Sequence, residues 1–523
     1  MNVDAPSRVG VSPSPASSRE MFTSDFFQSP LDRIAKFGQT QVHLYRQDVT
    51  LQDYFMALQM DNPAAPRATL ADLRANTTLK SWAIQKADKV SRLRNQRTFK
   101  ADVLLCWDPY FSRRTEIQFF LATLLGLAQT GATIICLLPV AASCRKEAEE
   151  KLAAAGRSAQ VIFLDPAMSL DSIDARVRPG FARMRGQSAL EKTIQILEPH
   201  GLTPSREVES RFEHLAYFVE SWERLAPCIE FDTVVTRCHW HALCCPVSRT
   251  ALQRGKQVIT FEQGVIGHSL DVPVTVSKYV AFGEPSATFL SRMNRKFHEA
   301  VGMPEPPVDY VLGGCLFDKI IDLRGQFDRG TVLIVDIPVL SDDFYGMAGQ
   351  GQAMLELAER LLQAEPSLRR LVIRAHPYWS NLDLEACKQL VRRYPNRCEL
   401  SHPAWALEDD LRRASIVVGL TSGVLTVAAA SGLPVVFLDT QNAYKTGDQA
   451  CFSSETLMPD AAFREISKML KDERAYAQAQ AQAVRDGSEY YAQGKNCDFS
   501  AGFFEQLLRP ATSAAKVPQQ TKS

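Results

Sequence analysis

The chain has 523 residues, of which 46% are hydrophobic and 23% are charged, a balance that is normal for a soluble globular protein. Lysine and arginine together number 59, aspartate and glutamate also number 59, and the formal net charge is zero. This balance excludes a general attraction to nucleic acid or to anionic membranes, so any basic surface must be local. The length predicts two ordinary domains with an appendage.

The N-terminal residues carry no apolar core of the kind that a signal peptide needs. Residues 1–24 are rich in serine and proline and predict a disordered tail, and residues 25–95 predict an N-terminal helical addition. The 12 cysteines form no CxxC pair and no His/Cys cluster with zinc spacing. We therefore expect a cytoplasmic protein whose thiols are small buried side chains.

Apolar runs typical of buried parallel strands alternate with helical patterns along the chain. These runs are 101–107, 132–140, 159–165, 231–236, 256–261 and 278–283, and then 331–337, 370–375, 397–400, 415–420 and 434–438. They are too many for one comfortable doubly wound sheet, so the prediction is an α/β protein with two Rossmann-like domains. The uncharged stretch 117–140 is interrupted by Gly131, which predicts a helix followed by a strand, not a membrane span.

The strand pattern lapses near 285–330, where prolines and turn glycines predict a domain boundary. We expect one Rossmann-like domain at 96–300 and another at 325–460, facing each other across a central cleft of the kind that is common in nucleotide-sugar chemistry. Residues 461–509 predict helices that pack across both domains, and 510–523 predict a polar tail. Neither domain carries GxGxxG or a Walker A loop, which argues against a dinucleotide oxidoreductase and a P-loop NTPase.

Polar residues follow the predicted strand 370–375. Arg374, His376 and Pro377 lie where ligands of open α/β sheets bind, beyond the carboxyl ends of the strands. Pro377 cannot extend the ladder, and the imidazole of His376 can donate to a phosphate oxygen. The alternative is a histidine that only caps a loop.

Thr421, Ser422 and Gly423 form the turn between a strand that ends at Leu420 and a helix that is predicted from Val424 to Ser431. Two hydroxyls and a glycine at a helix N-terminus can form an anion site, with free amides at the positive end of the dipole. An ordinary N-cap would explain one hydroxyl but not the three-residue turn. Gly432 is predicted as the residue that ends this helix in a left-handed conformation.

Carboxylates that could do chemistry occur in two further loops. Asp342 and Asp343 follow the strand 331–337 and could serve as nucleophile, base or metal ligand, or only as a solvated helix cap. Glu262 ends the strand 256–261, and the glycines behind it predict a sharp loop that faces the cleft. We interpret Glu262 as a candidate base or acceptor-binding group.

The order of these motifs resembles the donor-binding domain of GT-B glycosyltransferases. The matching residues are RAHP (374–377), TSG (421–423) and GLPVVF (432–437). The acidic loop VLSDDFYG (339–346) is similar to that of the bacterial capsule-synthesis family that contains β-Kdo transferases. FEQGVIGHS (261–269) with SKYVAFGE (277–284) is similar to the QHG passage of surface-carbohydrate transferases, although Glu262-Gln263-Gly264 replaces its usual histidine motif.

This resemblance implies a GT-B fold and transfer of a sugar, Kdo or another acid sugar, from a CMP-activated donor to a surface glycan or glycolipid. It also implies that His376, Thr421 and Ser422 hold the donor phosphate, and that Asp343 or Asp342 acts as nucleophile or base. A UDP-sugar transferase or sugar epimerase of the same fold stays open, as does a non-catalytic GT-B scaffold in a polysaccharide assembly machine.

The predicted partners are a nucleotide sugar and a glycan or lipid-linked acceptor, with no nucleic acid. We expect no cofactor and no divalent metal, because the nucleotide sugar is a substrate. Basic residues in 88–100 and 175–186 predict peripheral contact with anionic lipid at the inner membrane, although solvated helix faces would explain them equally well.

Overall fold

The computed structural model describes residues 98–510 apart from several gaps. The gaps are 108–113, 139–143, 165–221, 223–224, 240–243, 263–273, 275, 302–303, 317, 325–328, 337–349, 376–381, 402–404, 420–421 and 439–455. The predicted tail at 1–24, the helical addition at 25–95 and residues 511–523 lie outside the described part of the chain.

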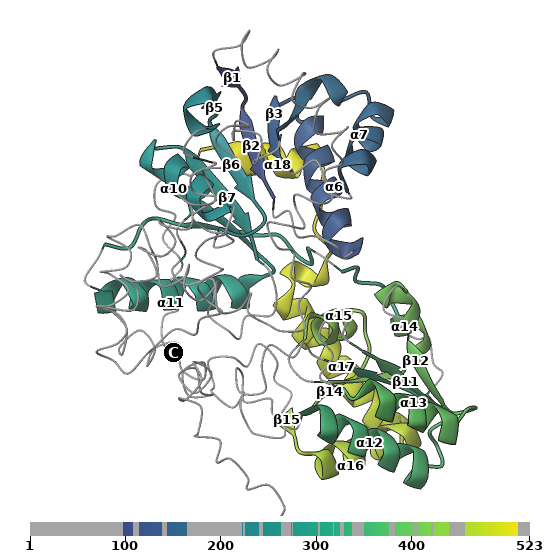
Figure 1. The fold of residues 1–523 in the computed structure, drawn as a ribbon. Coiled ribbons are helices and arrows are strands. Elements are labelled where there is room, and N and C mark those ends of the chain that lie inside the picture. The colour runs from purple at the N-terminus through teal and green to yellow at the C-terminus, as the bar shows by residue number, and fades with distance from the viewer. Residues whose placement is uncertain are drawn as a thin grey trace, which may run out of the picture.

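The first domain is built on a seven-stranded parallel sheet with the strand order β4-β3-β2-β6-β7-β8-β9 (Figure 1). Its strands are β2 (Val103–Cys106), β3 (Ile134–Leu137), β4 (Val161–Leu164), β6 (Thr233–Thr236), β7 (Gln257–Phe261), β8 (Lys278–Ala281) and β9 (Asp309–Leu312). Its helices are α6 (Arg114–Gln129), α7 (Cys144–Ala154), α10 (Cys244–Gln253) and α11 (Glu284–Val301), with short turns η2 (Ser158–Gln160) and η5 (Ala226–Cys228). A separate pair joins β1 (Phe99–Lys100) to β5 (Ile229–Glu230).

The second domain is a six-stranded parallel sheet with the order β12-β11-β10-β13-β14-β15. Its strands are β10 (Thr331–Val335), β11 (Arg370–Arg374), β12 (Cys398–Ser401), β13 (Ile416–Gly419), β14 (Val435–Leu438) and β15 (Thr456–Leu457). Its helices are α12 (Gln350–Ala364), α13 (Leu384–Arg393), α14 (Leu407–Arg413), α15 (Gly423–Ala430) and α16 (Pro459–Lys471). The chain then continues through α17 (Glu473–Tyr490), η6 (Ala492–Gly494) and α18 (Ala501–Leu508).

Both sheets begin with the third-second-first-fourth strand order of a doubly wound fold, so the predicted α/β architecture with two Rossmann-like domains is confirmed. Each predicted apolar run forms a strand. The signal is clearest in the central strands β2, β3, β6 and β10, which are buried at every position because both faces of the sheet are covered. The first sheet extends beyond the predicted limit of residue 300, however. Its seventh strand, β9, is half-exposed, so its sequence lacks the continuous apolar signal.

The uncharged stretch 117–140 folds as predicted. Helix α6 ends at Gln129, Gly131 adopts a left-handed φ of 87°, and the buried strand β3 follows. Within the described ranges, no helix is both long and apolar enough to cross a membrane.

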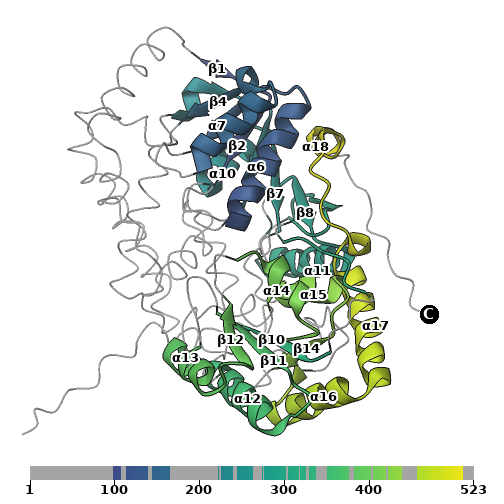
Figure 2. The same ribbon diagram turned by 90° about the vertical axis from the view of Figure 1, so that its right-hand side faces the viewer.

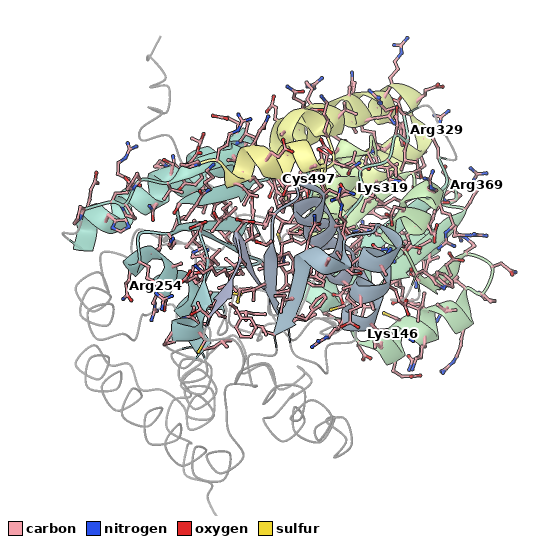
Figure 3. All side chains as sticks on the ribbon, turned by 90° about the horizontal axis from the view of Figure 1, so that it is seen from above. Lys146, Arg254, Lys319, Arg329, Arg369 and Cys497 are labelled. Carbon is pink, nitrogen blue, oxygen red and sulfur yellow. The ribbon has the colours of Figure 1, made fainter. Side chains whose placement is uncertain are left out.

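The chain crosses between the domains twice, and the two crossings are hydrogen-bonded to each other. The first crossing is the linker between β9 and β10 (residues 313–330). The second is the segment after α17 (residues 491–500), which we call the return segment. The Cys315 amide donates to the Lys495 carbonyl at 2.9 Å, and the Cys497 amide donates to the Cys315 carbonyl at 2.8 Å. Seen from above, Lys319 of the linker and Cys497 of the return segment lie close together (Figure 3).

Side chains extend this pairing into the second domain. The Asn496 amide group donates to the Ile320 carbonyl at 3.0 Å and accepts from the Ile320 amide at 2.7 Å. The next amide, from Ile321, donates to Ser431 Oγ at 3.1 Å, at the end of α15. The linker, the return segment and α15 therefore form one connected unit.

Helix α17 approaches its neighbours so closely that glycine is required. A Cβ on Gly487 would lie 2.3 Å from the Ala430 amide nitrogen of α15. A Cβ on Gly283, at the start of α11, would lie 2.3 Å from the Tyr490 carbonyl oxygen. Because both obstacles are backbone atoms, neither can move aside as a flexible side chain would. Helix α17 thus contacts α15 of the second domain and α11 of the first.

The last helix, α18, packs back on the first domain beside α6 (Figure 2). Phe504 of α18 is fully buried, and its ring fills the place where a Cβ on Gly126 of α6 would be. The Lys278 ammonium donates to the carbonyls of Leu507 at 3.0 Å and Arg509 at 2.6 Å, at the C-terminal end of α18. Burial lowers the pKa of Lys278, and the nearby Asp309 carboxylate opposes this shift.

We expect Gly487→Ala to destabilise the protein by about 1–3 kcal/mol, because the added methyl group would overlap backbone atoms of Ala430. Urea unfolding measures the loss. The matched control is Gly502→Ala in α18, where the nearest atom to a Cβ is Ser500 Oγ at 3.8 Å. This control should be neutral or stabilising by up to about 1 kcal/mol through helix propensity. Equal unfolding midpoints for the two variants would contradict the close packing of α17.

Candidate functional site

The candidate site lies at the carboxyl edge of the second sheet, where strand order reverses between β10 and β13. Gly419 ends β13, and a Cβ there would lie 2.9 Å from the Val335 carbonyl oxygen of β10. Ser422 is the N-cap of α15, and its Oγ accepts from the Val424 amide at 3.3 Å. Gly423, the first helical residue, has no acceptor for its amide within the helix. Among the described residues, a Cβ there would meet nothing within 4 Å beyond its chain neighbours and its own helix. This half-buried helix start has the geometry of an anion site.

The rest of α15 fixes this helix start to the return segment. As predicted, Gly432 ends the helix with a φ of 92°, and the Leu433 amide donates to the Ala428 carbonyl at 3.0 Å. The Thr426 hydroxyl donates to the Gly423 carbonyl at 2.7 Å and lies 2.6 Å from the Tyr491 hydroxyl. Burial raises the pKa of Tyr491 well above its ordinary value, so this hydroxyl stays neutral.

Arg374 is described, and its guanidinium turns toward β12 and α14. It forms a 2.5 Å ion pair with Asp410 and donates to Ser401 Oγ at 3.3 Å and to the Trp405 carbonyl at 3.1 Å. The sequence predicted Arg374 at the donor site. In the described part of the chain, three hydrogen bonds from its guanidinium fix neighbouring elements, and its contact with a donor stays a prediction.

Asp410 is the centre of this cluster, and its side chain is fully buried. In addition to Arg374 it accepts from Ser401 Oγ and, at 2.6 Å, from Arg413. A buried carboxylate is retained at acceptable cost only when it is paired and hydrogen-bonded, as here. The cluster therefore ties β11, β12 and α14 together at the carboxyl end of β11.

Glu262 is also described, at the end of β7, and it is completely buried. One carboxylate oxygen accepts from the Phe282 amide at 2.6 Å, and the other accepts from Ser286 Oγ at 3.0 Å. These partners belong to the end of β8 and the first turn of α11. The prediction placed Glu262 in a loop facing the cleft. The structure places it inside the first domain, where it holds the start of α11.

The carboxyl edge of the first sheet is braced by a second buried ion pair. Arg237, which follows β6, meets Glu116 of α6 through Nε at 3.1 Å. Arg237 also donates to the backbone carbonyl of Glu262 at 3.4 Å, and its guanidinium lies 5.2 Å from the Phe119 ring centroid. The ends of β6 and β7 are thus fixed to α6 before the next loop begins.

The other candidates from the sequence lie outside the described residues. They are Asp342, Asp343, His376, Pro377 and Thr421. The strands and the helix that flank them are described, and β10, β11 and β13 end side by side at one edge. Because parallel strands share one carboxyl edge, the loops that follow these three strands begin at neighbouring points.

The sequence did not indicate the roles of several residues that the structure places at this edge. Asp410 and Ser401 are ordinary surface-type residues by sequence, and only their packing against Arg374 reveals their roles. Asp336, which directly follows β10, is 3% exposed, and its amide donates to the Arg374 carbonyl at 3.0 Å. For Asp336 the sequence did contain a signal, because a carboxylate directly after a buried strand marks the carboxyl edge of the sheet. In the part of the chain that the structure describes, no group of acidic, His and Cys side chains could hold a metal ion.

The basic segments that predicted membrane contact are largely undescribed. Residues 175–186 lie outside the described part, as do most of 88–100. Lys100 is described and pairs with Glu230 at 2.9 Å on the surface, an arrangement that contributes little to stability.

Comparisons with known proteins gave structural similarities only. No protein-family model matches the chain, and no curated protein matches its sequence. The UDP-GlcNAc 2-epimerase from Neisseria meningitidis bound to UDP-GlcNAc aligns over 79% of this chain and 100% of its own, with 14% identity and a TM-score of 0.45. A ugt transferase from Siraitia grosvenorii in complex with UDP aligns over 78% and 99%, with 12% identity and a TM-score of 0.44. The pneumococcal O-GlcNAc transferase GtfA in complex with UDP and GlcNAc aligns over 56% and 59%, with 12% identity and a TM-score of 0.37.

Identities and scores this low say nothing about what the present chain binds. The topology of the chain itself defines its class. Two doubly wound parallel sheets lie in succession, and a C-terminal helix returns from the second domain to the first. This is the GT-B fold.

We expect Asp410→Ala to cost about 3–5 kcal/mol, because the change leaves the buried guanidinium of Arg374 without its carboxylate. Chemical unfolding with urea measures this cost. Asp409→Ala is the matched control, since Asp409 is an exposed neighbour in the same helix, and it should cost less than about 1 kcal/mol. A loss for Asp410→Ala no larger than that of the control would show that the cluster does not stabilise this edge.

Proposed function

We propose that this chain is a glycosyltransferase that takes its sugar from a nucleotide-sugar donor. The observation that supports this proposal is the half-buried start of α15 at the switch point between β10 and β13. In open α/β sheets this is the position at which ligands bind. A helix start with an N-cap hydroxyl and an amide that has no acceptor within the helix favours a phosphate group.

The donor phosphate would lie against the Gly423 amide and the hydroxyls of Ser422 and Thr421. His376, on the neighbouring loop, would donate a further hydrogen bond to the same phosphate. These groups would stabilise the negative charge that grows on the nucleotide as it leaves, which is an electrostatic form of catalysis. No metal ion is needed for this arrangement, because helix amides and an imidazole can carry that charge.

The finer proposal is a CMP-activated donor that carries Kdo or another acid sugar, with a surface glycan or glycolipid as acceptor. The support for this choice is the resemblance of the acidic loop 339–346 to that of capsule-synthesis enzymes. In this scheme Asp342 or Asp343 provides the carboxylate that attacks the anomeric carbon or activates the acceptor.

Nucleotide binding tests the donor site. We expect CMP to raise the thermal unfolding temperature more than UDP, GDP or CDP at equal concentration. A ligand present at 100 times its Kd stabilises the folded state by about 2.7 kcal/mol. Ser422→Gly should reduce this effect, because it removes the Oγ donor while costing the helix only a few tenths of a kcal/mol.

The control for this experiment is Ser500→Gly, the same change at the N-cap of α18. It should leave nucleotide stabilisation unaltered. Stabilisation by UDP alone would indicate that the donor is a UDP sugar and not a CMP sugar. If no nucleotide stabilises the protein, the transferase proposal fails in favour of a non-catalytic scaffold.

Activity measurements distinguish the aspartate pair Asp342 and Asp343 from Glu262 as the source of the catalytic carboxylate. Under double displacement, Asp342→Ala or Asp343→Ala should abolish transfer, and intact-protein mass spectrometry with donor alone should detect a glycosylated species. Glu262→Gln should retain most activity, because an amide can accept from the Phe282 N–H and donate to Ser286 Oγ.

The opposite pattern would assign the chemistry to the first domain. A Glu262→Gln variant that folds normally but loses transfer, together with active aspartate variants, would make Glu262 the base of a single inverting displacement. Circular dichroism and the unfolding midpoint of each variant verify that a lost activity is not a lost fold.

A further inference from the structure

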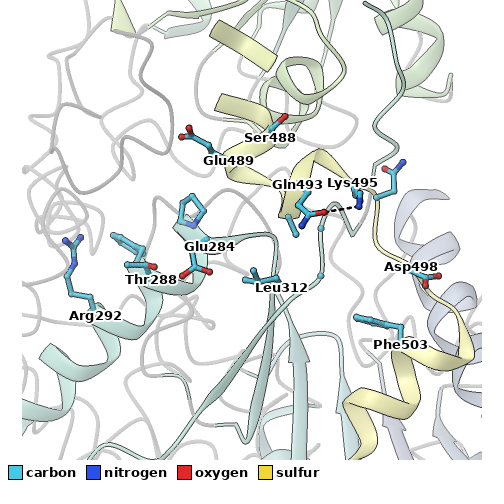
Figure 4. Close-up of a pocket in the computed structure, with 16 residues that line it drawn as sticks. Glu284, Thr288, Arg292, Leu312, Ser488, Glu489, Gln493, Lys495, Asp498 and Phe503 are labelled. Carbon is cyan, nitrogen blue, oxygen red and sulfur yellow. Dashed lines mark hydrogen bonds between the residues drawn. The ribbon is translucent and has the colours of Figure 1, made fainter. Parts of the chain in front are cut away.

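A cavity of about 940 Å³ lies beside the paired crossings, away from the start of α15. One wall is the first half of α11, and the facing wall is the end of α17 together with η6 (Figure 4). The linker and the first turn of α18 complete the lining. This volume lies within the range of protein sites that enclose a small organic ligand.

The lining combines apolar surface with hydroxyl and carboxylate groups. Phe289, Leu312 and Phe503 provide apolar surface, and Leu312 is 43% exposed, which is unusual for a large aliphatic side chain. Thr288 and Ser488 add hydroxyls from the two facing helices. Surfaces of this mixed kind suit a ligand that has both C–H faces and hydrogen-bonding edges.

Two carboxylates in the cavity are available to a ligand. Glu284 begins α11, and Glu489 lies near the end of α17 on the opposite wall (Figure 4). Among the described residues, neither takes part in a hydrogen bond or ion pair. Asp498, by contrast, accepts from the Ser500 amide at 3.1 Å and from the Ser500 hydroxyl at 2.8 Å.

The amide group of Gln493 is held in place by its neighbour. Gln493 has a left-handed φ of 56°, a strained conformation for a residue other than glycine. Its Oε1 accepts from the Lys495 ammonium at 2.9 Å (Figure 4). This bond leaves the Nε2 group of Gln493 as a donor in the cavity.

The charge of the lining restricts the class of ligand. Three carboxylates, from Glu284, Glu489 and Asp498, face two cations, from Arg292 and Lys495. A nucleotide or another phosphate ester would meet more negative than positive charge. For a polyamine, repulsion from Lys495 and Arg292 would offset much of the attraction to the carboxylates. A neutral ligand rich in hydroxyl groups avoids both penalties, since each hydroxyl can donate to a carboxylate and accept from an amide.

We propose that this cavity binds two or three units of a neutral oligosaccharide. The inference extends the proposed function, because a glycan acceptor would offer such a segment at a distance from the reacting end. Carboxylates and Gln493 would bind the hydroxyl edges, and Phe289, Leu312 and Phe503 would cover the C–H faces of the sugar rings. Individual hydrogen bonds of this kind contribute little, so we expect a Kd on the order of 1 mM.

Saturation-transfer difference NMR on the full chain tests this proposal, with cellotriose, maltotriose and chitotriose as probes at millimolar concentration. At least one trisaccharide should give a saturable signal. Thr288→Trp, which fills the cavity from an exposed position on α11, should abolish the signal. Glu489→Ala should weaken binding about tenfold, through loss of a charge-assisted hydrogen bond.

Controls separate this cavity from the donor site. Glu505→Ala, an exposed glutamate of α18 outside the lining, should bind the trisaccharide normally. Ser422→Gly should also bind it normally, and Thr288→Trp should keep its response to CMP. Absence of a saturable signal with all three probes, survival of the signal in Thr288→Trp, or its displacement by CMP would each overturn the proposal. The first two of these outcomes do not bear on whether the start of α15 binds a nucleotide.

Discussion

The paired crossings between the domains are the constraint on which the rest of the molecule depends. Cys315 and Cys497 belong to segments far apart in sequence, yet their backbones are directly hydrogen-bonded. One chain of hydrogen bonds runs from this junction into the first domain. The Ala492 amide donates to the Phe282 carbonyl, and the Phe282 amide donates to the Glu262 carboxylate. Another runs through Tyr491 to Thr426 in α15. Apolar side chains from both sheets belong to one continuous cluster around it, so the two domains share part of a core.

This arrangement explains why conspicuous polar residues near the carboxyl edges serve the fold. A carboxylate or guanidinium at the end of a buried strand must be paired, because leaving it unpaired costs several kcal/mol. Arg374 and Glu262 are paired with Asp410 and with Ser286 and the Phe282 amide, respectively. In the second domain, the helix start at Ser422 and Gly423 lies three and four residues beyond the end of β13.

The sequence predicted the strands and α15 well, because their signals are local. A strand buried on both faces, such as β10, is a continuous apolar run, and Gly432 marks the end of α15 through its own backbone conformation. The roles of Arg374 and Glu262 could not be predicted, because Asp410 and Ser286 lie 36 and 24 residues away in the chain. Strand β9 was missed because it is a half-exposed edge strand, and such a strand need not be apolar throughout.

The position of α18 has a consequence for how the protein is made. The first sheet ends at Leu312, but the helix that covers Gly126 and uses Lys278 as its cap is synthesised only after the second domain. During translation the second domain therefore emerges while the first still exposes the apolar face of α6 that Phe504 will cover. The domain that is made first is therefore completed second, because an apolar face of α6 stays open to aggregation until α18 has been synthesised.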